Sequence, residues 1–297
     1  MRIFVTGASG FIGGSVATRL VQAGHRVRGL VRDPAKVEAV RDTGVEPVAG
    51  TLDDRALLSR EAEAADAVVN AASSDDRGAI ETLVAALAGS GKALLHTSGT
   101  SIVADEALGE PSDASFDEET PFTPVPEKQA RVALDRFVLA APGIRSVVLC
   151  NSLIYGTGLG AEPESAQLPL LAAEARKTGV ARHIGRGLNI WSTVHIADVA
   201  ELYLQALETA PAGTFCFVEN GEASFRAMVG AIAERLGLGA AQPWPAEEAI
   251  AALGRQTAVF SLGSNSRVRG AKARGLLGWA PQHTSVLDWI HTELPLV

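Results

Sequence analysis

The sequence predicts an α/β fold: a doubly wound parallel sheet, with a smaller lobe interleaved towards the C-terminal end. Two observations support this prediction. The chain opens with a β-branched strand that passes through a glycine-rich turn into an apolar helix, and short apolar runs then alternate with helical runs up to residue 150. This alternation is typical of a parallel sheet covered on both faces. With 297 residues, 47% of them hydrophobic and 20% charged, the chain can bury a sizeable core.

The first thirteen residues are typical of a dinucleotide-binding loop. Gly7 allows a sharp turn after the strand, Gly10 has no Cβ where a pyrophosphate must approach, and Gly13 allows the helix to lie close to the strand. The N–H groups of the first helical turn would face the phosphates. An ordinary turn is the alternative, but the position between a strand and a helix favours a cofactor site. The candidate contacts are Thr6, Gly7, Ser9, Gly10, Phe11, Ile12 and Gly13.

The end of the second strand is the position that distinguishes NAD from NADP. A helix at 11–23 and a strand at 25–31 place Arg32 where a carboxylate would hold the ribose 2′-hydroxyl of NAD. A cation at this position favours NADP(H), and Lys36 lies one helical turn later. The alternative is that both cations are solvated, while Asp33 and Pro34 begin the next helix as its N-cap and first residue. NAD(H) therefore remains possible.

The spacing of the three glycines resembles a known family. Thr6-Gly-Ala-Ser-Gly-Phe-Ile-Gly13 is similar to the T-G-x-x-G-x-x-G of short-chain dehydrogenases/reductases, especially their extended and atypical branches. The resemblance implies a Rossmann-like fold in which two further turns meet the adenosine. The family's G-D-L is Gly50-Thr51-Leu52 here, and Asn70-Ala-Ala-Ser73 takes the place of its N-A-A-G turn. The implied contacts are Thr51, Leu52, Ala71, Ala72 and Ser73.

The remaining elements of the first half follow the same alternation. Strands are predicted at 46–49, 67–70, 93–97 and 144–150, and helices from 53 and at 78–88. The fifth strand ends in His96-Thr-Ser-Gly-Thr-Ser101, which matches the hydroxyl-rich strand end where the resembling family polarises the carbonyl of its substrate. Ser98, Thr100 and Ser101 are therefore catalytic candidates, although such residues also form ordinary turns.

The Tyr-x-x-x-Lys pair of that family is missing. The chain has two tyrosines, Tyr155 and Tyr203, and each is followed four residues later by leucine. The helix at 127–137 aligns with the family's catalytic helix so that Glu127 replaces the tyrosine and Arg131 the lysine. At this spacing both lie on one helix face, with Arg131 able to hold the nicotinamide ribose and Glu127 as the candidate general acid or base. A surface ion pair is the alternative.

Two loops are expected to border the substrate. Asn151-Ser-Leu-Ile-Tyr-Gly156 is similar to the R-P-x-x-[VI]-Y-G of the extended branch, which implies that Asn151 contacts the cofactor. Tyr155 is then the one phenol that could stand near the chemistry, with packing as its alternative role. The acidic, proline-rich segment 105–126 is predicted to be a long loop across the site, either a lid or a solvated insertion.

The second half of the chain extends the resemblance almost to its end. Residues 189–198 resemble the [FW]-x-x-[IV]-H-[IV]-x-D segment of the extended branch, in which His195 and Asp198 tie a strand to the helix that begins at Val199. Residues 264–281 resemble its closing S-x-[KR]-A-x-x-L-G-W-x-P. The other predicted elements are a helix at 167–178, a strand at 214–218 and a helix at 224–236 capped by Ser224.

Composition limits the partners. The net charge of −8 argues against nucleic acid, and the longest uncharged apolar stretch, 146–161, is too short and too polar to cross a membrane. The first strand begins at once, which leaves no room for a signal peptide. Cys150 and Cys216 lie in strand-like runs without other metal ligands, as expected of buried thiols in a reducing cytoplasm. We expect a small-molecule substrate, no metal and no membrane partner; a homodimer is compatible with the sequence.

We therefore predict a dinucleotide-binding domain of residues 1–150 plus about 186–212, and a substrate lobe of about 151–185 and 213–297. The expected function is NADP-dependent oxidation or reduction of an alcohol or carbonyl on a small, largely apolar substrate. One alternative is a non-catalytic NADP(H)-binding sensor similar to the NmrA-type members of the family. A third is a sugar-nucleotide epimerase or dehydratase, which the missing tyrosine disfavours.

Overall fold

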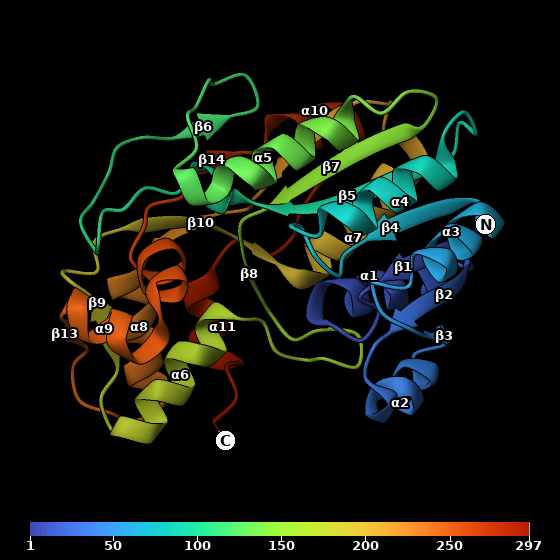
Figure 1. Cartoon of the computed structure of the whole chain (residues 1–297). Coiled ribbons are helices and arrows are strands. Elements are labelled where there is room, and N and C mark those ends of the chain that lie inside the picture. The colour runs from blue at the N-terminus through green and yellow to red at the C-terminus, as the bar shows by residue number, and fades with distance from the viewer. Residues whose placement is uncertain (297) are drawn as a thin grey trace.

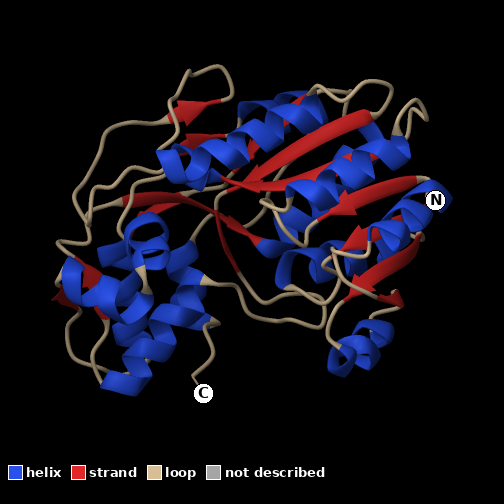
Figure 2. Cartoon of the chain, viewed as in Figure 1, coloured by secondary structure: helices blue, strands red, loops and turns tan. Residues whose placement is uncertain are grey.

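The structure, a computed structural model that describes residues 1–296, is organised around one seven-stranded sheet (Figures 1 and 2). The strand order is β11-β7-β5-β4-β1-β2-β3, and all neighbouring strands are parallel. The order reverses between β1 and β4. The strands are β1 (Arg2–Thr6), β2 (Arg26–Val31), β3 (Glu46–Ala49), β4 (Ala67–Asn70), β5 (Ala93–Gly99), β7 (Arg145–Asn151) and β11 (Thr214–Val218). The predicted doubly wound α/β fold is confirmed.

Helices cover both faces of this sheet (Figure 1). Ile3 and Val5 of β1 face one layer, and Phe4 faces the other, because successive side chains of a strand point to opposite sides. The first layer contains α1 (Phe11–Gln22), α2 (Val37–Asp42), α7 (Ile196–Thr209) and α10 (Ala271–Leu277). The second layer contains α3 (Arg55–Ala64), α4 (Arg77–Leu87) and α5 (Pro126–Leu139).

Local sequence signals explain where several helices begin. The carboxylates of Asp54 and Asp76 accept hydrogen bonds from backbone N–H groups in the first turns of α3 and α4, at 2.9 and 2.8 Å. Asp33 caps the short 3₁₀ turn Pro34–Lys36 in the same way, with the proline at its first position as expected. Ser224 caps α8 (Phe225–Arg235) by accepting from the N–H of Ala227.

The smaller lobe has a hydrophobic core of its own. Its helices are α6 (Gln167–Thr178), α8, α9 (Ala246–Leu253), α11 (Val286–Thr292) and a π-helical segment, Gln256–Leu262. Two small sheets complete it: β9 (Arg182–Ile184) with β13 (Gln242–Trp244), and β12 (Glu222–Ser224), β10 (Ile190–His195) and β8 (Leu153–Tyr155) in that order. Within residues 1–296 no helix is long and apolar enough to cross a membrane.

The division between the lobes differs from the one expected from the sequence. Strand β11 lies after residue 213, yet it pairs with β7 as the edge strand of the large sheet, and α10 packs on that side of the molecule. Conversely, β10 lies within 186–212 but belongs to a small sheet with β8 and β12. The chain crosses between lobes more often than the sequence indicates, because the exposed edge of β7 is completed by a strand distant in sequence.

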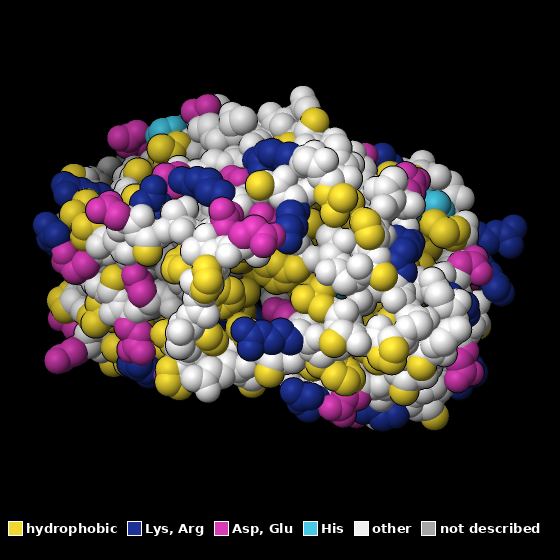
Figure 3. All heavy atoms as spheres, turned by 90° about the horizontal axis from the view of Figure 1, so that it is seen from above, with side chains coloured by type: hydrophobic (Ala, Val, Ile, Leu, Met, Phe, Trp, Pro, Cys, Tyr) yellow, Lys and Arg dark blue, Asp and Glu magenta, His cyan; other side chains and the backbone are white. Residues whose placement is uncertain are grey.

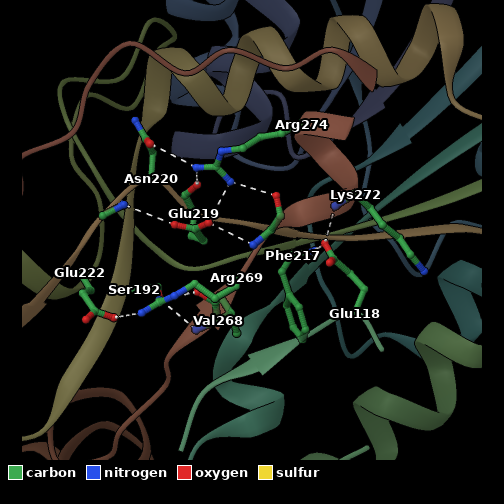
Figure 4. Close-up of polar contacts among 12 residues, drawn as sticks. Glu118, Ser192, Phe217, Glu219, Asn220, Glu222, Val268, Arg269, Lys272 and Arg274 are labelled. Atoms are coloured by element: carbon green, nitrogen blue, oxygen red, sulfur yellow. Dashed lines mark hydrogen bonds and ion pairs between the residues drawn. The ribbon is translucent and has the colours of Figure 1, made fainter. Parts of the chain in front are cut away.

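Polar contacts hold the C-terminal segment against this sheet edge (Figure 4). The Glu219 carboxylate accepts from the N–H of Gly270 at 3.0 Å and from Arg274 at 2.8 Å. Glu118 accepts from the N–H of Phe217 in the edge strand at 3.1 Å. Nearby, β6 (Phe116–Asp117) pairs with β14 (Val268–Arg269). The contact with Glu118 satisfies an edge N–H of β11 that would otherwise be open to other chains.

One expected tie between strand and helix is confirmed and one is wrong. His195 Nδ1 accepts from the N–H of Ala197 at 3.2 Å, so it caps α7, which begins at Ile196 rather than Val199. Asp198 instead accepts from the N–H groups of Gln282 and His283, at 3.0 and 2.9 Å. Its carboxylate therefore anchors the C-terminal tail.

Candidate active site

Two adjoining cavities open at the carboxyl ends of the strands, where ligands bind in folds of this class. The outer cavity, about 730 Å³, lies over the glycine loop and the ends of β2 and β3. The inner cavity, about 550 Å³, lies between β5, α5 and the smaller lobe. Gly10 and Ala71 line both. Seen from above, the surface is hollowed between the two lobes, with hydrophobic side chains on the visible walls (Figure 3).

Each of the three loop positions requires glycine for a different structural reason. Gly7 has a φ of +73°, and a Cβ there would lie 2.8 Å from the Cα of Ala72. A Cβ on Gly13 would lie 2.3 Å from the Gly7 carbonyl oxygen. At Gly10 a Cβ would meet only that oxygen, at 3.4 Å, and would otherwise point into open space. Gly7 and Gly13 are thus required by the fold, whereas the bare backbone at Gly10 fits a ligand that approaches closely.

The start of α1 leaves donors for that ligand. Gly10 is its N-cap, and within residues 1–296 no side chain caps the helix, so its first N–H groups have no side-chain acceptor there. Phe11 and Ile12 of this turn line the inner cavity. Thr6 holds the neighbouring turn in place, since its hydroxyl donates to Asn70 at 2.6 Å and accepts from the N–H groups of Ala71 and Ala72. The loop therefore fits the pyrophosphate of a dinucleotide.

The outer cavity brings together the residues expected at the adenosine end. Arg32 and Lys36 line it, and Arg32 has no hydrogen bond or ion pair within residues 1–296. The ammonium of Lys36 pairs with Glu162, 2.7 Å away in the loop that follows β8. The other expected residues on its wall are Gly7, Ser9, Gly10, Thr51, Leu52, Ala71, Ala72 and Ser73.

Ser98 lines the inner cavity but its hydroxyl proton is already engaged. The hydroxyl donates to Asp135 of α5 at 2.7 Å, and both side chains are buried. The other Asp135 oxygen lies 3.4 Å from His96 Nε2, and His96 Nδ1 lies 3.0 Å from the Asn70 amide. A chain of buried polar groups thus connects the turn after β4 with Ser98, whose oxygen is also in hydrogen-bond contact with the buried Cys150 thiol.

The other two hydroxyl candidates differ in environment. Thr100 is fully buried, and its hydroxyl is bonded to that of Ser266 at 2.9 Å, which is a structural contact. Ser101 lines the cavity and accepts from Arg131 at 3.1 Å. Thr100 also borders the inner cavity, but its side chain is fully buried, so Ser98 and Ser101 are better placed for catalysis than Thr100.

Helix α5 presents a different residue to the cavity from the one expected. Glu127 is 40% exposed, lies 3.8 Å from Arg255 and is not among the residues that line the cavity. Arg131 lines it and pairs with Asp75, and the hydrogen bonds from Arg131 hold the pKa of the Asp75 carboxyl below its usual range. Lys128, which the sequence comparison passed over, is 4% exposed and also lines the cavity.

The two residues expected from the loop after β7 separate in the structure. Asn151 lines the inner cavity, and its amide donates to Tyr203 at 3.1 Å. Tyr155 is buried in the core of the smaller lobe, with its ring 5.2 Å from that of His195, and it does not line the cavity. Burial raises the pKa of its phenol well above the usual value. The expectation that Tyr155 stands near the chemistry is wrong; packing is its role.

The segment 105–126 is not a lid in this structure. Of the residues described, none from this segment lines either cavity. It is held against the smaller lobe instead, where Asp105 accepts from Asn265 and Glu110 pairs with Arg186. Two of the acidic side chains on which the prediction of a lid or a solvated insertion was based, Asp105 and Glu110, attach the segment to the smaller lobe.

Residues from distant parts of the chain complete the inner wall. Trp191 comes from β10, and Gln256 and Ser261 come from the π-helical segment. No sequence motif predicted these three residues as part of the site. For Lys128 a signal existed: with Arg131 and Asp135 it forms a stripe at positions i, i+3 and i+7, and a lysine on an inward stripe is unusual.

The fold and this cleft define a dinucleotide-binding protein with a doubly wound nucleotide domain. The model of the NAD dependent epimerase/dehydratase family matches residues 3–215, and the chain belongs to that family.

Similar proteins indicate which type of enzyme within this family the chain resembles. An oxidase from an Acremonium species is 32% identical, covering 94% of this chain and 92% of its own. The 4-hydroxy-2-methyl-3-oxo-4-farnesyl-3,4-dihydroquinoline-1-oxide ketoreductase of Stigmatella aurantiaca is 29% identical, covering 99% and 97%. The dTDP-glucose 4,6-dehydratase of Bacillus anthracis, solved with NAD, shares the fold with a TM-score of 0.79 at 19% identity, covering 98% and 95%. The chain is thus an oxidoreductase of the extended short-chain dehydrogenase/reductase type, and its cofactor class is a nicotinamide dinucleotide.

Proposed function

We propose that the protein is an NADP-dependent oxidoreductase that interconverts a carbonyl and an alcohol on a small, largely apolar molecule. The observation that carries this proposal is the junction of the two cavities at Gly10 and Ala71, which joins the dinucleotide loop to a pocket containing Ser98, Ser101 and Arg131. One extended ligand can occupy the outer cavity and reach the inner one. The name of the ketoreductase relative gives its substrate a farnesyl chain, and Phe11, Ile154 and Trp191 offer apolar surface on an inner wall that is otherwise largely polar.

The preference for NADP rests on two cations. Arg32 has no partner among residues 1–296, and Lys36 has only the half-exposed Glu162, so both can bind a 2′-phosphate. Asp33, the acidic residue next to Arg32, has its carboxylate engaged by the N–H of Ala35. Asp53 and Asp76 also line the outer cavity. NAD remains the alternative cofactor.

The residues of the chain then have distinct tasks. A bound nicotinamide dinucleotide supplies or accepts a hydride. The first N–H groups of α1 hold its pyrophosphate, and Arg131, anchored by Asp75, holds the nicotinamide ribose. The Ser98 oxygen, oriented by Asp135, accepts a hydrogen bond from the substrate hydroxyl, and Ser101 is held beside it by Arg131. Trp191 and residues of the smaller lobe form the opposite wall of the pocket.

The test begins with binding and continues with turnover. Titration calorimetry with NADPH and NADH should give tighter binding of NADPH. A panel of apolar ketones and aldehydes, mixed with protein and NADPH, should include compounds that cause loss of the reduced-nicotinamide absorbance. Absence of binding by either dinucleotide would contradict the proposal.

A non-catalytic NADP(H) sensor is the second candidate function. It is favoured by the position of Glu127, which stands in the place of the family's tyrosine but does not line the cavity. Tight NADPH binding with no reduction of any carbonyl would support this candidate. A sugar-nucleotide epimerase or dehydratase is disfavoured, because neither Tyr155 nor Tyr203 is among the described residues that line the inner cavity.

A further inference from the structure

Lys128 is a largely buried lysine on the wall of the inner cavity. It is the third residue of α5, its exposed fraction is 4%, and it is part of the cavity wall. Within residues 1–296 its ammonium has no hydrogen-bond acceptor or ion-pair partner; Nζ lies over the ring of Phe260, 5.8 Å from the ring centroid. Buried lysines are rare unless they are paired, so a cavity-facing amine without a partner calls for a role.

The same face of α5 organises the hydroxyl groups of the pocket. Asp135, seven residues after Lys128, accepts from Ser98, and Arg131, three residues after it, donates to Ser101. Residues at these spacings lie on one side of a helix. Lys128 therefore lies on the face that meets the substrate hydroxyl or carbonyl, about one turn from Arg131 and two turns from Asp135, the residues that hold Ser101 and Ser98.

The charges around Lys128 are mixed. Arg131 and Glu127 belong to its own helix, and Asp75 approaches from the loop after β4. Arg255 packs over the same Phe260 ring at 5.4 Å, and Glu164 lies on the wall of the cavity. Burial and then the charge of Arg131 lower the pKa of Lys128 from its ordinary value, against the opposing effects of Asp75 and Glu127. A lower pKa makes the ammonium a better proton donor at neutral pH.

The other polar groups on the wall are poorer donors. The Ser98 proton is bound to Asp135, and the guanidinium of Arg131 does not release a proton. Thr100 and Ser101 accept from Ser266 and Arg131, and an aliphatic hydroxyl is a much weaker acid than an ammonium. Glu164 stands on an exposed part of the wall.

We propose that Lys128 is the proton donor that replaces the missing tyrosine, an inference that rests on the proposed carbonyl reduction. In the reducing direction the carbonyl carbon gains a hydride from the reduced nicotinamide dinucleotide, and the carbonyl π electrons move to oxygen. An Nζ–H bond of Lys128 breaks as its proton bonds to that oxygen. The products are the alcohol, the oxidised dinucleotide and a neutral amine, which regains its proton from solvent. Alcohol oxidation reverses each transfer and requires the neutral amine.

The first experiment compares Lys128→Met with Lys128→Arg in the full chain. Methionine preserves the volume without a proton, and arginine preserves the charge but cannot release one. Both variants should bind NADPH as the wild type does, and both should lower kcat by ~10²–10⁴-fold, the range typical of general acid catalysis. Lys177→Met, at an exposed lysine in α6, is the matched control and should keep wild-type kcat.

The pH profile separates a proton donor from a fixed charge. Wild-type reduction should fall as the pH rises through the pKa of Lys128, and alcohol oxidation should fall as the pH drops through it. The residual activity of Lys128→Arg should show neither the fall of reduction at high pH nor the fall of oxidation at low pH. Recovery of wild-type kcat by Lys128→Arg would show that only the charge matters and would overturn the proposal.

A second readout does not depend on turnover. In the protein labelled with ¹³C at lysine Cε, the signal that disappears in Lys128→Arg should titrate at lower pH than the exposed lysines. Titration together with those lysines, or full activity of Lys128→Met, would overturn the proposal while leaving the proposed function intact. Failure of the wild type to bind a dinucleotide or to reduce any carbonyl would instead overturn the proposed function, and this inference with it.

Discussion

The outer and inner cavities are built in different ways. The outer one is formed largely by backbone and by short contiguous segments, namely the glycine loop and the turns that follow β2, β3 and β4. The inner one is formed by side chains from β5, α5, β10 and the π-helical segment, which are distant in the sequence. The outer cavity depends on positions where only a small residue fits. The inner cavity depends on the rotation of each helix about its axis, which decides which side chains point into it. The two halves should therefore respond differently to substitution.

The largest effect is expected in the backbone half. Gly10→Val would place a branched side chain in space that both cavities share, so binding of NADPH and NADH should weaken by about 100-fold, equivalent to ~3 kcal/mol. The thermal midpoint should stay close to that of the wild type, because the Cβ at this position meets one protein atom at an ordinary distance. Gly13→Ala is the contrasting variant: its Cβ would collide with the Gly7 carbonyl, and stability should fall. Normal NADPH affinity in Gly10→Val would show that Gly10 is not needed for close approach of the dinucleotide.

A side chain in the outer cavity should control which dinucleotide is bound, and not whether one is bound. Arg32→Ala should weaken NADPH binding by about tenfold, or ~1.5 kcal/mol, the lower end for a charge-assisted contact at an exposed position. NADH affinity should change little. Calorimetric titration of both dinucleotides against wild type and variant measures the difference. Equal affinities of the wild type for NADPH and NADH would contradict the role of Arg32.

The junction between the lobes should make stability sensitive to acid. His195 stacks on His283 with ring centroids 3.8 Å apart, and burial, then the charge of His283, lowers the pKa of His195 from 6.5 to about 4. The unfolded chain binds more protons between these values, so this contribution is present above pH 6.5 and is lost as the pH falls towards 4. We expect a loss of about 1–2 kcal/mol, after allowance for partial exposure.

Urea unfolding at neutral pH and at about pH 5 measures this loss. His195→Gln should show a smaller drop in unfolding free energy than the wild type over the same interval. An equal drop in both proteins would assign the acid sensitivity to other groups.

The smallest effects are expected at two residues that the sequence placed at the chemistry. Glu127→Gln should leave kcat within about twofold of the wild type, because Glu127 lies outside the described wall of the cavity. Tyr155→Phe should also keep kcat and should be neutral or slightly stabilising, because it removes a buried hydroxyl that has no hydrogen-bond partner in the part of the chain that the structure describes. A large loss of turnover in Glu127→Gln would restore the alignment-based assignment and weaken the contrast with Lys128.

Much of the fold could be predicted from the sequence because it depends on local patterns. The strands at 46–49, 67–70 and 214–218 and the helix at 167–178 have the predicted bounds, since each is an apolar run or periodic segment bordered by turn residues. The caps at Asp33 and Ser224 followed from short-range hydrogen bonding. The three glycines placed the loop, because their spacing is itself the geometry of a tight turn.

The inner half of the site was decided by tertiary structure. The period of α5 relates Lys128, Arg131 and Asp135 to one another, but their direction depends on how the helix packs against β5 and β7, and a local pattern does not contain that rotation. A shift of one residue, about 100° around the helix, exchanges Glu127 for Lys128 at the cavity. Likewise, β11 pairs with the edge of β7 in the large sheet, and Tyr155 packs in the core of the smaller lobe; neither placement follows from a local pattern. By itself the sequence determined the cofactor loop and the order of the elements; packing between segments far apart in the chain decided which side chains meet the substrate.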